Sequence, residues 1–318
     1  MEKSPSLSVV VPVLDEEASL EELQARFAAS LPADAEIIYV DDGSSDGTFA
    51  VLEKIAARDP RVRACRFRRN FGKSAALAAG FRRARGSIVA TIDADLQEDP
   101  ADIPRLAAKL EEGFDLAGGW RRRRRDCVPK VLGSRLFNSA ASALAGVRFR
   151  DLNCGLKAMR RSVVEDIGIA GGFHRFLPLL AHARGYRVTE VEIRHEPRRY
   201  GRSRYGGRRV VEGLLDLLVV LFLGRFEGRP SRYFAGMGLL LGLAGAAISA
   251  FLAALRIVTG SIQSRFPLLA LGLVLLVVGV QLFSLGLFGD LIAYHFRSRS
   301  LTEPVADEIG PGPPPDGT

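Results

Sequence analysis

The segment LSVVVPVLDEEASLEELQARFAAS, residues 7–30, decides the fold of this chain. It begins with a run of β-branched residues that Pro12 interrupts, a pattern typical of a strand that ends in a loop. From residue 16 to residue 30, apolar side chains then recur at helical spacing, at Leu20, Leu23 and Phe27. The segment therefore predicts a strand followed by a helix.

The same strand and helix unit repeats further along the chain. The expected strands cover residues 36–40, 62–67 and 87–92, and the expected helices cover residues 48–58, 73–84 and 100–111. Strands that alternate with helices predict an α/β domain with a mostly parallel sheet. Because ligands of such sheets bind beyond the carboxyl ends of the strands, we expect a site at the loops after Val11, Val40 and Ile92.

Acidic residues gather in the loop after the second expected strand, which reads DDGSSDGT from Asp41 to Thr48. Its glycines permit tight turns, and Ser45 or Asp46 could cap the next helix. On composition alone, a simple turn with a cap and a ligand-binding loop both stay open.

A second acidic loop, DADLQEDP, follows the strand expected at residues 87–92. Asp93 and Asp95 are two residues apart, so in extended geometry their side chains point the same way. Oxygen ligands of this kind suit Mg²⁺ or Mn²⁺ bound together with substrate phosphates, which indicates a diphosphate ligand. The alternative is a solvated acidic loop before the helix at Pro100. No Gly-x-Gly-x-x-Gly follows the first strand, which argues against a dinucleotide enzyme.

Composition narrows the class of protein. The chain has 318 residues, 47% of them hydrophobic, and a formal net charge of +8. Much of the excess positive charge lies in the run Arg121–Arg125 and in residues 198–232. The second segment lies directly before an apolar region, which favours anionic lipid headgroups over nucleic acid. Three widely spaced cysteines without a CxxC pair, and no pattern of a secretory signal, indicate a domain in the reducing cytosol.

Two uncharged stretches, Tyr233 to Leu255 and Pro267 to Gly289, are each long enough to cross a bilayer as a helix. A buried hairpin in a soluble core is the alternative. The positive-inside rule places both chain ends in the cytoplasm, because arginines outside the two stretches outnumber those in the connecting loop. The outer arginines are Arg225, Arg229, Arg232, Arg297 and Arg299, and those of the loop are Arg256 and Arg265.

These patterns divide the chain into four parts. An α/β domain covers residues 1–206, and an interfacial amphipathic helix with a linker covers residues 207–232. Two transmembrane helices occupy residues 233–295, and a proline-rich, disordered cytosolic tail occupies residues 296–318.

The ordered motifs of the chain resemble those of family 2 glycosyltransferases, which have the Rossmann-like GT-A fold. The motifs of this resemblance are Val11–Glu17, Asp41–Thr48, Asn70–Lys73 and Asp93–Gln97. Two further segments, Asp151–Lys157 and Arg199–Tyr205, look like the polyprenyl-phosphate branch, with its dolichol-phosphate mannose synthases and bactoprenol glucosyltransferases. The resemblance covers roughly residues 7 to 295.

The resemblance implies roles for individual residues. Nucleotide-binding residues would be Pro12, Leu14, Glu16, Asp41, Asp42, Asp93 and Ala94. Asp93, Asp95 and Gln97 would hold Mg²⁺ or Mn²⁺, and Asp151 would take the catalytic position. Acceptor and phosphate contacts would come from Arg121, Lys130 and Ser134, and from Arg199 and Ser203 in a segment that closes over the donor.

The implied function is inverting transfer of a hexose, glucose from a UDP-linked donor, to a polyprenyl phosphate in the inner membrane. A GDP-mannose-dependent mannosyltransferase is the alternative. A processive polysaccharide synthase is disfavoured because its Gln-x-x-Arg-Trp motif is absent, and a non-catalytic scaffold is disfavoured by the retained Asp93, Asp95 and Asp151. Glycines in the first apolar stretch make a homo-oligomer an open possibility.

Overall fold

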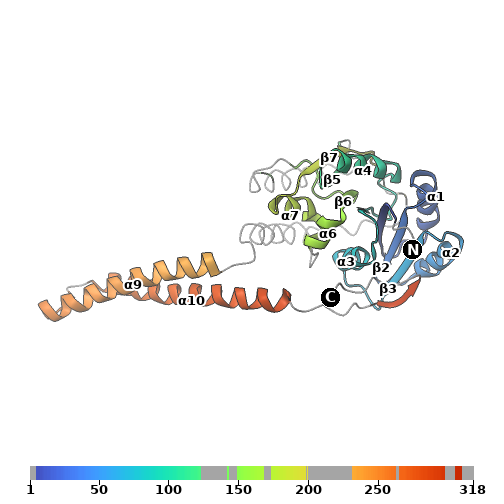
Figure 1. Ribbon diagram of the computed structural model, residues 1–318. Helices are drawn as coiled ribbons and strands as arrows, with labels where there is room; N and C mark the ends of the chain where they lie inside the picture. Colours follow the sequence, from blue (N-terminus) through green and yellow to red (C-terminus); the bar gives the residue numbers. More distant parts are fainter. Residues whose placement is uncertain are drawn as a thin grey trace. The chain divides into compact units, whose positions relative to one another are not determined.

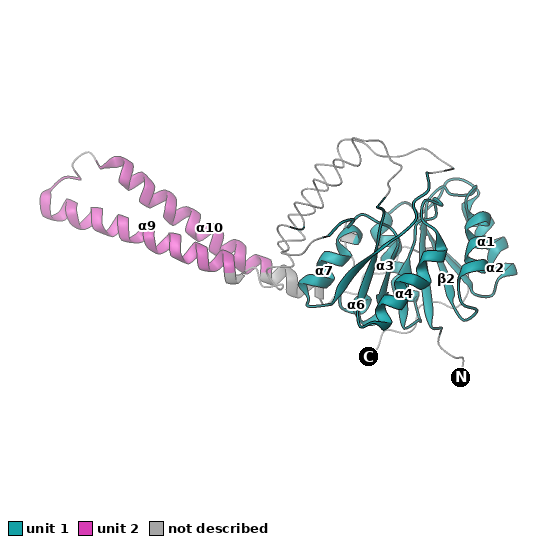
Figure 2. Cartoon of the chain, turned by 90° about the horizontal axis from the view of Figure 1, so that it is seen from above, with its two compact units in different colours: residues 1–221, 303–318 teal, residues 222–302 magenta. Residues whose placement is uncertain are grey.

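Figure 1 shows a computed structural model of the chain. The structure describes residues 5–122, 142, 149–167, 173–197, 199, 231–262, 265–297 and 305–309. The chain forms two compact units, one of residues 1–221 with 303–318 and one of residues 222–302 (Figure 2).

The first unit alternates strands and helices in its first third. These elements are β1 (Leu7–Val13), α1 (Leu20–Ser30), β2 (Glu36–Asp41), α2 (Thr48–Arg58), β3 (Val62–Phe67), α3 (Lys73–Arg83) and β4 (Ile88–Thr91). A 3₁₀ turn, η1 (Pro100–Asp102), then leads into α4 (Ile103–Glu111). The remaining elements are β5 (Leu116–Trp120), β6 (Lys157–Arg160), α6 (Arg161–Ile167), η2 (Phe173–Phe176), α7 (Leu177–Ala183), β7 (Val188–Glu192) and β8 (Val305–Ile309).

The strands form one sheet in the order β7-β5-β6-β4-β1-β2-β3-β8. Strands β4, β1, β2 and β3 are parallel neighbours, whereas β6 is antiparallel to both β4 and β5. The predicted α/β fold is thus confirmed, with antiparallel β6 and β8 making the sheet mixed. The carboxyl ends of β1, β2 and β4 lie at one edge of the sheet, where the acidic loops were expected.

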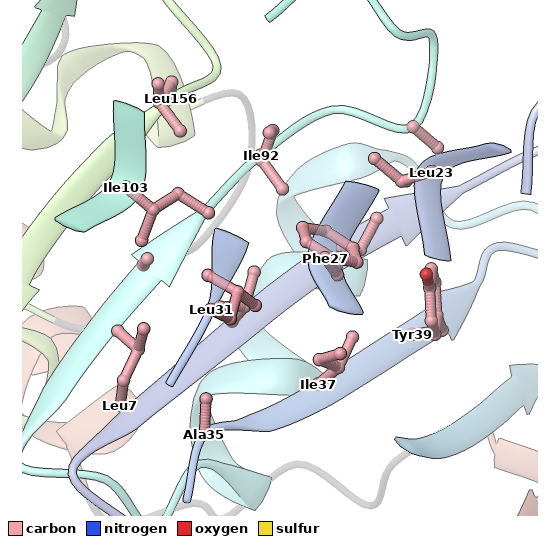
Figure 3. Close-up of a cluster of buried hydrophobic side chains, with 14 of the residues drawn as sticks. Leu7, Leu23, Phe27, Leu31, Ala35, Ile37, Tyr39, Ile92, Ile103 and Leu156 are labelled. Carbon is pink, nitrogen blue, oxygen red and sulfur yellow. The ribbon is translucent and has the colours of Figure 1, made fainter. Parts of the chain in front are cut away.

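Helices cover both faces of the sheet because the strands alternate apolar side chains between them. On one face, Val9, Val11, Ile37 and Tyr39 pack with α1, α2 and α4. Figure 3 shows Leu23 and Phe27 of α1 beside Ile37 and Tyr39 of β2. On the other face, Val10 of β1 and Ile38 and Val40 of β2 pack with α3, α6 and α7.

Helix α3 lies very close to β1. A Cβ added at Gly80 of α3 would lie 2.2 Å from Cγ1 of Val10. The glycine therefore sets the distance between this helix and the central strand, and with it the position of the N-terminus of α3.

Element boundaries differ from the expectation at two places. Helix α1 begins at Leu20 and not at residue 16, because Asp15, Glu16 and Glu17 bond instead to the loop after β2. The prediction of a disordered tail is wrong for Val305–Ile309, which forms β8 antiparallel to β3. The open backbone edge of β3 explains this strand, since its N–H and C=O groups need partners.

Strand β8 is also held by side chains. Arg83 of α3 has a side chain only 4% exposed, and its Nε lies 2.8 Å from Oε1 of Glu308. The backbone ladder and this ion pair together attach the tail to the first unit.

The second unit is a pair of long apolar helices, α9 (Ser231–Thr259) and α10 (Phe266–Arg297). Both contain a stretch long and apolar enough to cross a membrane, Tyr233–Thr259 and Phe266–Gly289. Only 17% and 11% of the most apolar windows are buried. This exposure disfavours the alternative of a buried hairpin in a soluble core. The interfacial helix predicted at residues 207–232 lies outside the described residues up to residue 230.

Glycines bring α9 and α10 together. A Cβ at Gly238 would lie 2.5 Å from the carbonyl oxygen of Gly279, and one at Gly245 would lie 2.6 Å from that of Gly272. A Cβ at Gly236, in contrast, would meet no atom within 4 Å. Gly238 and Gly245 therefore allow the close approach of the two helices of the same chain.

Candidate active site

The loops after β1 and β2 are joined by hydrogen bonds. The backbone N–H of Asp15 donates to Oγ of Ser44 at 2.9 Å, and that of Glu16 donates to Oγ1 of Thr48 at 2.9 Å. Asp15 has a positive φ of 53°, a left-handed conformation that is uncommon outside glycine. The two loops thus form one rigid rim at the carboxyl edge of the sheet.

The paired acids at the end of β2 have different partners. Oδ1 of Asp41 accepts from the N–H and the hydroxyl of Ser44, at 2.8 and 2.6 Å. Asp42 accepts from the N–H of Phe71 at 2.7 Å and from that of Gly72 at 2.9 Å. Burial raises the pKa of Asp42, against the lowering effect of these amides. Both carboxylates therefore accept hydrogen bonds that fix the loops around the predicted nucleotide site.

Asp42 fixes the loop that carries Lys73, the first residue of α3. Gly72 has a φ of +92°, which an L side chain rarely adopts, so the turn into the helix depends on this glycine. The ammonium of Lys73 then donates to Oδ1 of Asp93, in the loop after β4. A chain of contacts therefore links the acids after β2 to the acids after β4.

The loop after β4 turns sharply around Leu96, which is fully buried and has a φ of 59°. This left-handed leucine lies between Asp95 and Gln97, whose N–H donates to Oδ1 of Asp95 at 3.3 Å. Non-glycine residues in this conformation carry backbone strain and are concentrated at functional sites. Asp95 itself is 8% exposed.

The segment before β6 closes over Asp93. A Cβ at Gly155 would lie 2.7 Å from Cγ of Asp93, so a glycine is needed for this close approach. Burial by itself raises the pKa of Asp93, but the attraction and hydrogen bond of Lys73 outweigh it and hold the pKa below its ordinary value. His174 and Lys157 lower the pKa further.

Glu98, Arg121 and Asp151 form a buried charged cluster beside these acids. The guanidinium of Arg121 binds Asp151 through two hydrogen bonds, Nε to Oδ2 at 2.8 Å and Nη2 to Oδ1 at 3.0 Å. Nη1 of the same side chain lies 3.6 Å from Oε1 of Glu98. Arg121 was predicted to contact the acceptor. In the structure its guanidinium instead orients the side chain of Asp151, the predicted catalytic residue.

Glu98 is a buried acid with one unpaired oxygen. Its side chain is 3% exposed, and its Oε2 has no hydrogen-bond partner. Burial, followed by the charge of Asp93, raises the pKa of Glu98 to about 7. Asp95 adds to this effect, which places all three acids within electrostatic reach of one another.

Among the described residues, no group of three or more histidine, cysteine, aspartate or glutamate side chains is arranged to hold a metal ion. Asp93 and Asp95 nevertheless fit a magnesium-type site, since such ions use one or two carboxylates and complete their shell with water and substrate phosphates. The buried, unpaired Oε2 of Glu98 supports this fit, because a nearby cation would offset its charge.

Two further basic groups lie close to Asp93. Lys157 of β6 is buried and donates to the carbonyl of Cys154, and burial lowers its pKa. His174 of η2 shares a hydrogen bond of 2.7 Å with Oγ of Ser74. Burial, with the repulsion of neighbouring cations, lowers the pKa of His174 well below its ordinary value.

The remaining predicted residues are placed as follows. Pro12 lies in β1 opposite Val40, Leu14 follows β1, and Ala94 is buried beside Asp93. Arg199 is exposed and pairs with Glu22 of α1 at 3.0 Å and with Glu196 at 3.1 Å. Lys130, Ser134 and Ser203 lie outside the described residues.

Sequence reasoning did not assign four residues that the structure brings to this site, namely Lys73, Glu98, Lys157 and His174. Lys73 and Lys157 stand within quoted motifs, and Glu98 stands in the acidic loop, so their positions gave a signal. His174 had none, because nothing in the local pattern indicates that η2 packs against the start of α3.

Comparisons with known proteins identify a family and several relatives. Residues 8–168 match the model of the family described as Glycosyl transferase family 2. A dodecaprenyl-phosphate galacturonate synthase of Rhizobium johnstonii is 36% identical over 299 residues, covering 92% of this chain and 88% of that protein. An undecaprenyl-phosphate 4-deoxy-4-formamido-L-arabinose transferase of Proteus mirabilis is 36% identical over 296 residues, covering 92% and 89%.

The fold is also found in solved structures. Glucosyl-3-phosphoglycerate synthase from Mycobacterium tuberculosis, in complex with Mn²⁺, uridine diphosphate and glucosyl-3-phosphoglycerate, aligns with a TM-score of 0.54 at 23% identity. The alignment covers 67% of this chain and 80% of that one. A structure of that synthase with Mg²⁺ and uridine diphosphate aligns with a TM-score of 0.53 at 25% identity, covering 67% and 79%.

Proposed function

Because the chain belongs to glycosyl transferase family 2, we propose that it transfers a sugar from a nucleoside diphosphate to a polyprenyl phosphate in the inner membrane. The observation that carries this proposal is the charged cluster at the carboxyl edge of the sheet. There, Glu98 interacts with Asp93, Asp95 and Arg121, and Arg121 pairs with Asp151. The acids proposed to bind the donor diphosphate with a cation would thus lie near the proposed catalytic carboxylate.

Asp93 and Asp95, with Gln97 on the same loop, would hold Mg²⁺ or Mn²⁺. A bound cation would stabilise the negative charge that grows on the diphosphate leaving group. The chain's own residues supply the rest of the site. The rim of β1 and β2 would bind the nucleoside through Pro12 and Leu14, on a backbone that Asp41 and Asp42 hold rigid.

Asp151 and Arg121 would position the acceptor phosphate together, since the guanidinium offsets the repulsion between the carboxylate and the phosphate. A phosphate monoester has a second pKa of about 6, so at neutral pH it is already an anion and needs little help from a base. Two hydrogen bonds from Arg121 fix the direction of the Asp151 carboxylate. Orientation of the attacking oxygen is therefore the proposed role of this pair.

The finer predictions stay proposals. They are inversion at the anomeric carbon, glucose as the sugar, uridine diphosphate as the carrier, and GDP-mannose as the alternative donor. The named relatives act with galacturonate and with 4-deoxy-4-formamido-L-arabinose, which adds both sugars to the donors worth testing. The two apolar helices support a multi-pass membrane location with both ends in the cytoplasm.

The test uses full-length protein in liposomes that contain undecaprenyl phosphate. Labelled UDP-glucose, UDP-galacturonate, UDP-linked 4-deoxy-4-formamido-L-arabinose and GDP-mannose are supplied in turn with Mn²⁺. We expect one donor to label the lipid, with the anomeric configuration of the product opposite to that of the donor.

Matched variants connect this activity to the site. Asp93→Asn and Asp95→Asn should each lower the rate at least about 100-fold, because charge stabilisation of the leaving group is lost. Asp99→Asn is the control, since it lies on the same loop but caps η1 through Ala101, and asparagine caps as well as aspartate. Labelling of no lipid with any donor, or full activity in Asp93→Asn, would show the proposal to be wrong.

A further inference from the structure

Lys73 is held between two fixed neighbours. On one side, the N–H of Gly72 donates to Asp42 at 2.9 Å, and on the other, Oγ of Ser74 shares a 2.7 Å hydrogen bond with His174. The backbone at Lys73 is therefore fixed, while its side chain remains 34% exposed. Only the flexible four-carbon stem is free to move the ammonium group.

The ammonium of Lys73 contacts an acidic side chain that is proposed to bind the divalent cation. It donates to Oδ1 of Asp93, one of the two carboxylates that fit a divalent cation. Other groups close to Asp93 are Lys157, whose ammonium donates to the carbonyl of Cys154, and His174, which bonds Ser74. Within the described residues, Lys73 is thus the cation that directly pairs with Asp93.

We propose that Lys73 is an exchangeable counter-ion, which neutralises Asp93 when no divalent cation is bound and is displaced from this carboxylate when one binds. The inference rests on the proposed function, because it takes Asp93 as part of the site for the cation. It gives Lys73 a positioning role, because its ammonium stabilises the Asp93 loop before the cation and the donor bind.

The physical reason is a competition between two cations for one carboxylate oxygen. Asp93 is half-buried, and leaving such a charge without a partner is costly. A lysine ammonium is a compact charge on a flexible stem, so it can leave for solvent when a divalent ion takes its place. An arginine would hold the carboxylate with a planar, bidentate fork and would exchange less easily.

The first experiment compares Lys73→Gln with Lys109→Gln in full-length protein in detergent, with Mn²⁺ as the probe. Lys109 of α4 is the matched control because it is 37% exposed and pairs with the carboxylate of Glu112, the residue that follows the helix. Electron paramagnetic resonance of free Mn²⁺ should show at least about tenfold tighter binding in Lys73→Gln, since a competing positive charge is lost. Lys109→Gln should bind Mn²⁺ as the wild type does.

Thermal unfolding separates exchange from a merely structural role. Exchange predicts that Lys73→Gln is less stable than the wild type without metal and equally stable at saturating Mn²⁺, because tighter binding adds stability by linkage. A structural role predicts the same loss of stability under both conditions. Lys73→Arg, which keeps the charge, should bind Mn²⁺ no more tightly than the wild type.

A second measurement needs no variant. An amine-reactive reagent is applied to wild-type protein with and without Mg²⁺, and the labelling rate of each lysine is read by peptide mass spectrometry. Mg²⁺ should raise the labelling rate of Lys73 severalfold and leave that of Lys109 unchanged. An unchanged rate at Lys73, in protein that binds Mg²⁺, would overturn the inference.

The outcomes distinguish this inference from the proposed function. If wild type and Lys73→Gln bind Mn²⁺ with equal affinity and Asp93→Asn abolishes binding, the metal site stands and the exchange at Lys73 is wrong. If none of these proteins binds Mn²⁺, the metal site itself is wrong, and the inference is overturned with it.

Discussion

Replacing Arg121 with methionine should destabilise the first unit strongly. The variant removes two hydrogen bonds to Asp151, of 2.8 and 3.0 Å, and the 3.6 Å contact with Glu98. Side chains of Asp151 and Glu98 are only 1% and 3% exposed, so neither carboxylate gains water in exchange. Breaking a buried pair by removal of one partner costs about 3–5 kcal/mol.

Thermal unfolding of the full-length protein in detergent measures this loss. For a unit of this size, 1 kcal/mol shifts Tm by about 2–4 °C, so Arg121→Met should lower Tm by roughly 6–20 °C. The control is Arg122→Met at the next position. Arg122 pairs with Glu192 at 3.3 Å, but the two side chains are 63% and 48% exposed, and such surface pairs contribute about 0–1 kcal/mol.

A double-mutant cycle assigns the effect to the pair. Asp151→Leu alone and Arg121→Met alone should each destabilise, whereas the double variant should lose less than their sum by about 0.5–3 kcal/mol. A shift in Tm no larger for Arg121→Met than for Arg122→Met would refute the conclusion that this guanidinium holds Asp151 in place.

Three further predictions concern other contacts. Because burial keeps the pKa of His174 well below its ordinary value, the unfolded chain binds the extra proton as pH falls below about 6.5, and stability is lost. His174→Gln should therefore lose less stability than wild type between pH 7 and pH 5 in thermal unfolding. Gly238→Ala should destabilise the helix pair by about 1–3 kcal/mol through overpacking, whereas Gly236→Ala, with open space around its Cβ, should not. Glu308→Ala should lower Tm by leaving the buried Arg83 without this partner, and equal stability of the variant would contradict the role given to the ion pair.

The parallel half of the fold could be predicted because local pattern and tertiary role coincide there. Val9, Val10 and Val11 are buried on both faces of a central strand, so the apolar run in the sequence reads directly as β1. The motif at Asp93–Gln97 could be predicted for the same reason, since it directly follows a buried strand. In both cases one short segment carries all the information.

Features that join distant segments could not be predicted. Arg121 and Asp151 are thirty positions apart, and no local pattern shows that the first would clamp the second. The start of α1 was predicted too early, because the backbone N–H groups of Asp15 and Glu16 donate to the side chains of Ser44 and Thr48 and do not take part in a helical turn. Strand β8 was missed because a short polar segment forms a strand only when an open sheet edge is present.

The pairing of β8 with β3 has a consequence for biosynthesis. About 240 residues separate Phe67 from Val305. Because ribosomes add about 5–20 residues per second, the edge of β3 stays unpaired for roughly 10–50 s before β8 is synthesised. During this interval both apolar helices leave the ribosome while the nascent sheet still exposes an unpaired strand. Nascent chains of this protein should accordingly depend on chaperones until β8 has left the ribosome, since an open edge invites pairing with other chains.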